Sequence, residues 1–168
     1  MCDLPVVSAG YPSVGSICSI SNGHVASALG APVLLIGKPG VGDAVDSFNL
    51  NSTYLQSFGV SVLGAIFNKL PVDGFYSVHA CKDAVESYFS QYQPQSRAYG
   101  FVPLVPPPTP QAPPAATNPS LASDEGGGLT GLGLTSDGLG EEDSFRRAFA
   151  EHVDWEQLLF DVWHHQVR

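Results

Sequence analysis

The sequence predicts an α/β fold, a partial three-layer α/β/α domain built around a mostly parallel sheet. Two largely apolar runs, residues 32–36 and 60–67, are typical of parallel strands that are buried on both faces. A stretch with apolar residues at helical spacing follows each run. Because strands that alternate with helices are joined by crossover connections, we expect the two runs to lie side by side in parallel.

Three helices are expected around these strands. Residues 22–29 carry apolar residues at helical spacing, and Gly30 is a typical helix stop. Asp43 can cap a second helix, which Gly59 should end as a residue in the left-handed conformation. A third amphipathic helix is expected over residues 78–89. The alternation of strand and helix is therefore continuous along this part of the chain.

Composition divides the chain into three regions. Residues 1–105 hold the strand and helix signals, which include short strands over residues 4–7 and 99–105. Residues 106–143 are rich in proline and then in glycine. Such a tract buries too little apolar surface to offset its ordering entropy, so it is predicted to be a disordered linker. Residues 144–168 are predicted to form a helical tail that packs back on the sheet domain.

A capping box is expected to open the last helix of this tail. Asp154 and Gln157 stand three residues apart, as the two members of a capping box do. Leu158 and Val162 follow at helical spacing. We expect their apolar face to rest on the sheet.

Charge and cysteine usage exclude several classes of function. The formal net charge is −9, from 16 acidic and 7 basic residues, so neither nucleic acid nor an anionic membrane is an expected partner. Cys2, Cys18 and Cys81 form no CxxC pair, which argues against a disulfide framework and against a zinc site. No secretory signal or transmembrane run is visible. We expect a cytoplasmic location or another reducing interior.

Open parallel sheets bind ligands at the carboxyl ends of their strands, so the loops that follow the strands are the candidate sites. The loop at 37–42 has the glycine spacing of a phosphate loop, with Lys38, Gly40 and Gly42 in it. Asp43 and the residue after it stand where such a loop needs Lys and Ser or Thr, and a carboxylate would repel phosphate. The loop is either a tight turn or a contact to a substrate or a second subunit.

Two other strand ends carry polar candidates. Gly10, Ser13, Gly15 and Ser16 form a loop that either lets a ligand approach the backbone closely or makes an ordinary turn. The dipeptide at 68–69, Asn-Lys, ends an apolar run. The side-chain amide of the asparagine offers a donor and an acceptor, as reading a base edge requires. The alternative is that it caps a turn before the proline that follows.

An ordered series of motifs resembles the dethiobiotin synthetase-like domain, a member of the P-loop group that includes the cobyrinic acid amide synthases and the N-terminal domain of some phosphate acetyltransferases. The series covers about three fifths of the chain. It comprises Gly-Tyr-Pro-Ser-Val-Gly-Ser at 10–16, Ser-Asn-Gly-His-Val-Ala at 21–26, Leu-Gly-Ala-Pro-Val-Leu-Leu-Ile-Gly at 29–37, Gly-Val-Gly-Asp-Ala-Val-Asp at 40–46, Gly-Ala-Ile-Phe-Asn-Lys at 64–69 and Tyr-Gly-Phe-Val-Pro at 99–103.

The resemblance implies ATP and Mg²⁺ as cofactors, and in the type member ATP drives closure of the ureido ring in biotin biosynthesis. It places Asn68, Lys69, Pro103 and Leu104 on the adenine side of the nucleotide. It places the 10–16 loop near substrate and metal, and the loop with Lys38, Gly40, Gly42 and Asp43 against substrate or a partner subunit. A homodimer, or a partner chain that supplies the missing half, is the implied assembly.

Departures from the family pattern set the expected function. The phosphate loop of the family is expected upstream of Met1, and Val7 stands where the family has an acidic metal ligand. The sequence therefore predicts a partial or degenerate ATP-binding domain of the ligase type that is inactive, with no catalytic or metal-binding residues assigned. The alternative is a non-catalytic binding or regulatory module that completes its sheet with a partner chain.

Overall fold

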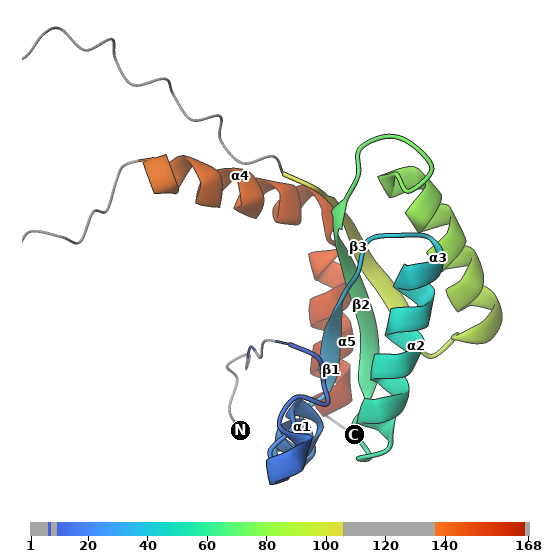
Figure 1. Cartoon of the computed structure of the whole chain (residues 1–168), viewed down its shortest axis with the longest axis vertical. Helices are drawn as coiled ribbons and strands as arrows, with labels where there is room; N and C mark the ends of the chain where they lie inside the picture. The colour runs from blue at the N-terminus through green and yellow to red at the C-terminus, as the bar shows by residue number, and fades with distance from the viewer. Residues whose placement is uncertain (1–6, 8–9, 106–136, 167–168) are drawn as a thin grey trace, which may run out of the picture.

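A computed structural model of the protein describes residue 7 and residues 10–105 and 137–166 (Figure 1). Its strands form a three-stranded sheet in the order β1-β2-β3, and both neighbouring pairs are parallel. The predicted α/β class is confirmed, and so is the parallel pairing of the two apolar runs. The elements in chain order are η1 (Ser16–Cys18), α1 (Asn22–Leu29), β1 (Val33–Gly37), α2 (Gly42–Gln56), β2 (Val62–Leu70), α3 (Val78–Tyr92), β3 (Arg97–Pro103), α4 (Asp137–His152) and α5 (Trp155–Gln166).

Helices cover both faces of the sheet (Figure 1). On one face α2 and α3 pack against the strands through a large apolar cluster that includes Phe48, Leu55, Phe67, Val85 and Phe89. On the other face the corner between α4 and α5 supplies Val153 and Leu158, which pack on Ile66, Tyr99 and Val102. The described elements thus form three layers, with the sheet in the middle.

Gly37, the last residue of β1, leaves room for the aromatic ring of Phe67 on the neighbouring strand. The ring of Phe67 stacks on Phe101, with centroids 5.4 Å apart and an interplanar angle of 14°. A Cβ atom added at Gly37 would lie 2.5 Å from that Phe67 ring. Glycine at the end of β1 therefore leaves the space that the aromatic pair fills.

The helix ends agree with the sequence only in part. Helix α1 spans the predicted residues, with Ser21 accepting a hydrogen bond from the His24 backbone N–H and Gly30 in the left-handed conformation. Asp43 does not cap α2, because the capping position is Val41 and Asp43 lies inside the first turn. Gly59 is left-handed as expected, but α2 already ends at Gln56.

The C-terminal region also departs from the predicted boundaries. Helix α4 begins at Asp137, inside the stretch predicted as linker, whereas residues 106–136 lie outside the described part of the chain. The predicted strand at 4–7 lies outside it too, except for Val7, which is in no strand and is 92% exposed.

Only half of the expected capping box forms at α5. The Asp154 carboxylate accepts a hydrogen bond from the Gln157 backbone N–H at 3.0 Å. The Gln157 side chain turns instead to Asp161, and the Asp154 N–H donates to the Tyr99 carbonyl at 2.7 Å. The reason is tertiary, because the α4–α5 corner pairs with the outer edge of β3 through an antiparallel bridge between Val153 and Gly100.

Candidate functional site

Three of the predicted loops meet at the carboxyl edge of the sheet. Gly37, Phe67 and Phe101 lie in one row across the three strands. The residues that follow them in each strand therefore emerge at the same edge, which brings together the Lys38 loop, Asn68 with Lys69, and Pro103 with Leu104. A hydrogen bond from the Leu104 N–H to the Leu70 carbonyl, at 2.8 Å, fixes the last of these ends beside β2.

Lys38 and Asp43, the charged side chains of the Lys38 loop, interact with other parts of the protein. The Lys38 ammonium lies over the Tyr11 ring, 5.2 Å from its centroid. A hydrogen bond to Tyr11 and the coulombic interaction with it raise the pKa of Lys38, and Asp43 adds a smaller effect in the same direction. Asp43 lies in the first turn of α2, where a carboxylate is favourable to the helix dipole. The negative charge at this helix start is therefore supplied by the chain itself.

Helix α3 holds Gly40 in place through a hydrogen bond. Its carbonyl oxygen accepts a hydrogen bond from the Cys81 thiol at 3.1 Å, and its φ of +118° is one that glycine tolerates best. Burial raises the pKa of the Cys81 thiol, which keeps it neutral and able to donate. These contacts favour the reading of the loop as a tight turn held to the core.

Asn68 takes the local role that the sequence left open. Its side-chain oxygen accepts a hydrogen bond from the Lys69 backbone N–H at 2.8 Å. Lys69 itself adopts a left-handed conformation, with φ of +61°, which is uncommon for a residue with a Cβ. The amide thus supports a turn inside the end of β2, and its NH₂ group remains the part that could face a ligand.

Only part of the 10–16 loop lies near the carboxyl ends of the strands. Its Tyr11 lies beside Lys38, but the Ser16 hydroxyl is 2.8 Å from the Tyr54 hydroxyl, on the last turn of α2. Helix α2 has 15 residues and is therefore about 22 Å long. Ser16, with Ser13 and Gly15 in the same hydrogen-bonded turn, consequently lies far from the strand ends. Gly10, with φ of +87°, begins this turn.

Two features are absent from the described residues. No cluster of three or more His, Cys, Asp or Glu side chains able to hold a metal occurs in that part of the chain. Nor does any helix within residues 10–105 and 137–166 have the length and apolar character needed to cross a bilayer.

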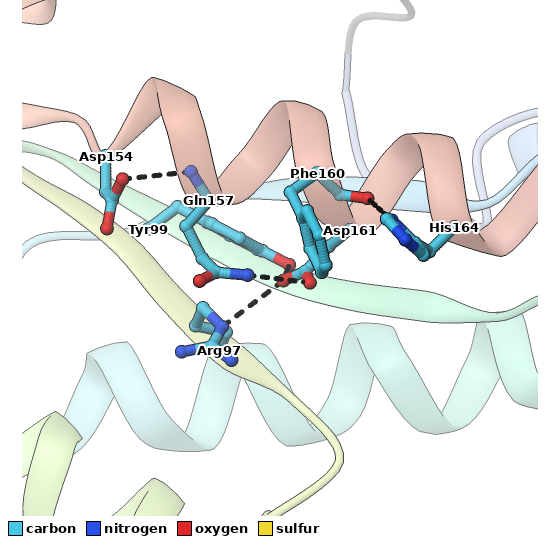
Figure 2. A network of polar contacts seen from close by, with 7 residues as sticks. All are labelled: Arg97, Tyr99, Asp154, Gln157, Phe160, Asp161 and His164. Carbon is cyan, nitrogen blue, oxygen red and sulfur yellow. Dashed lines mark hydrogen bonds and ion pairs between the residues drawn. The ribbon is translucent and has the colours of Figure 1, made fainter.

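A polar network at the opposite edge of the sheet was not predicted from the sequence (Figure 2). The Asp161 carboxylate accepts hydrogen bonds from Tyr99 at 2.8 Å, from Arg97 at 3.2 Å and from Gln157 at 2.8 Å. Burial first, and then the bond to Asp161, raise the pKa of the buried Tyr99 hydroxyl well above its usual value. Three donors satisfy one carboxylate, so the network joins α5 to β3 and leaves Asp161 little capacity for a ligand.

The network lines the wall of an open groove of about 870 Å³. The groove lies at the start of β2 and β3, where His164, His165 and Glu86 also contribute to its wall. No sequence signal could have indicated it, because Arg97 and Asp161 are 64 residues apart and their meeting depends on where α5 docks.

Searches of protein-family models, curated proteins and solved structures return no match to this chain.

Proposed function

We propose that this chain acts as a non-catalytic binding module that completes its parallel sheet with a strand from a partner chain. The observation that supports the proposal is the exposure of β1. All five of its residues are apolar or glycine, yet none is buried, and Ile36 is 60% exposed. Strands of parallel sheets are normally covered on both faces. Among the described residues β1 and β3 are the two edge strands, and the outer side of β3 is bridged by Val153 through Gly100.

The edge strand β1 also lacks, within its own residues, the features that usually prevent a second chain from pairing with it. Natural edge strands carry charged residues or prolines that discourage a second chain. Residues 33–37 contain neither, and Pro32, Lys38 and Pro39 stand only at the two ends of the strand. Lys38 lies over the Tyr11 ring. A bare apolar edge of this kind favours addition of a strand.

The residues that follow the carboxyl ends of the strands support the non-catalytic part of the proposal. Phosphate transfer needs backbone donors and cations that converge on the anion. Here Asp43 occupies the first turn of α2, Gly40 is bonded to the core, and Val7 stands at the position where the resembled family has its acidic metal ligand. No residue of this edge is therefore assigned a catalytic role.

Photo-crosslinking from β1 tests the proposal. We expect benzoylphenylalanine in place of Ile36 to give a covalent adduct with another protein chain on irradiation in cells, because the side chain points from the uncovered edge strand. The matched control replaces Leu50, which is 75% exposed on α2, and should give no such adduct. Crosslinking of position 36 within its own chain, or none above the control, would show that β1 has no partner.

A weak adenine-nucleotide site is the second candidate, as befits a partial ATP-binding domain of the dethiobiotin synthetase type. It is favoured by the convergence of Asn68 and Lys69 with Pro103 and Leu104 at one edge. Base contacts without a phosphate cradle should bind weakly. Titration of the full chain with Mg²⁺-ATP by calorimetry should therefore give a Kd no tighter than about 1 mM, or about −4 kcal/mol. Micromolar affinity would contradict this account of the phosphate side.

A further inference from the structure

A buried serine hydroxyl connects α1 to the last turn of α2. Ser21, which is 0% exposed, caps α1 by accepting a hydrogen bond from the His24 backbone N–H. The Tyr54 hydroxyl, on α2, donates to the same Ser21 oxygen at 2.9 Å. The Nδ1 atom of the His24 ring lies 2.7 Å from that oxygen. Ser21 Oγ therefore contacts three polar groups from two helices.

A count of hydrogens assigns the tautomer of His24. A serine hydroxyl has one hydrogen to donate and two lone pairs that accept. The Tyr54 hydroxyl and the His24 backbone N–H use both lone pairs of Ser21. Within the described part of the chain, the hydrogen of Ser21 then has one remaining partner, the Nδ1 atom of His24. Because a buried hydroxyl needs a partner, Nδ1 accepts this hydrogen, and the ring is neutral with its own hydrogen on Nε2.

We infer that this serine makes the docking of α1 on α2 sensitive to acid. A protonated histidine ring carries a hydrogen on both nitrogens. Nδ1 could then no longer accept, and its N–H would be directed at an oxygen whose lone pairs are already in use. The Ser21 hydrogen would be left without an acceptor in a buried site, which is unfavourable. Proton uptake by His24 is therefore expected to break the contact between Ser21 and the ring.

The surroundings of the ring do not offset the added charge. Residues 10–30 contain no Asp, Glu, Lys or Arg. The carboxylates of α2, Asp43 and Asp46, lie near the start of that helix, whereas the His24 ring packs on Phe58 just beyond its end, with centroids 4.6 Å apart. His24 also lies in the first turn of α1, where the helix dipole disfavours a positive charge.

Loss of this contact is expected to release α1, the helix that leads into β1. The two helices approach closely, because a Cβ added at Gly23 would lie 2.9 Å from the Phe58 ring. Helix α1 has only 8 residues, and isolated helices shorter than about 12 residues are marginal in water. The docked state requires a neutral His24 and the undocked state does not. The undocked state therefore binds more protons, and docking weakens as the pH falls.

Hydrogen exchange of the full chain at two pH values tests the inference. Between about pH 7.5 and about pH 5, the range in which histidine titrates, we expect the protection of α1 amides to fall at least about tenfold relative to β2. Exchange rates are first corrected for the intrinsic effect of pH on exchange. His24→Asn keeps an acceptor for Ser21 but cannot titrate, so it should abolish the loss. His79→Asn, the matched change on α3, should leave the loss unaltered.

Long-range proton–nitrogen NMR of His24 in the unmodified chain gives a readout that does not depend on how a variant folds. At about pH 7.5 we expect the hydrogen on Nε2 and the lone pair on Nδ1. A hydrogen on Nδ1 at that pH overturns the inference. Protection of α1 that does not change with pH relative to β2 overturns it too, as does an equal loss of protection in His24→Asn.

Discussion

Replacing Gly64 with alanine is expected to separate β2 from β3 and to unfold the sheet. Gly64 lies in the central strand, paired with Leu34 on one side and Arg97 on the other. Its φ is +153°, and an added Cβ would overlap the carbonyl oxygen of Arg97. Because the obstructing atoms belong to the backbone, no change of rotamer can relieve the overlap. We expect a loss of more than about 4 kcal/mol in the free energy of unfolding.

Urea unfolding followed by circular dichroism measures this loss. Small domains are stable by only about 5–15 kcal/mol, so Gly64→Ala should leave the chain largely unfolded or close to it. Gly42→Ala is the matched control, because nothing lies within 4 Å of its added Cβ and it begins α2. Alanine there should stabilise the helix by up to about 1 kcal/mol. Equal midpoints for the two variants would mean that β2 and β3 do not pair in this register.

The sheet was predictable from the sequence because its signals are local. A continuous apolar run identifies a buried strand without knowledge of its neighbours, and residues 32–36 and 60–67 proved to lie within or close to the paired strands. The bounds of helix α1 were predicted correctly because its stop, Gly30, directly follows the helix in the sequence. Where the stop is looser, as after Gln56, the predicted end was displaced.

The contents of the site were less predictable because they depend on distant contacts. Cys81 donates to Gly40 across 41 residues, and Ser16 meets Tyr54 across 38, so sequence spacing could not show that the first loop is anchored or that the second is drawn away. Asn68 was left open between two roles, since the left-handed conformation of Lys69 is not encoded by composition. The exposure of β1 was hidden for the same reason, because its apolar run predicts full burial.

Gly100→Ala is expected to undock the C-terminal helices while the remaining sheet persists. A Cβ at Gly100 would lie 2.6 Å from the His152 carbonyl oxygen and 2.8 Å from a methyl group of Val153. Either the α4–α5 corner moves off β3 or the sheet deforms. We expect the corner to move, because a parallel ladder of backbone hydrogen bonds holds β3 to β2. The α4–α5 corner is held to β3 by one isolated bridge, the bond from the Asp154 N–H to the Tyr99 carbonyl and side-chain contacts. We expect a cost of about 3 kcal/mol.

Hydrogen exchange read by mass spectrometry distinguishes this outcome from general unfolding. Amides of α5 should lose protection in Gly100→Ala, whereas those of β2 should keep most of theirs. Val153→Ala is the matched variant, since it shortens the side chain at the bridge without forcing the backbones apart. Unchanged protection of α5 in Gly100→Ala would contradict the close approach of this corner to β3.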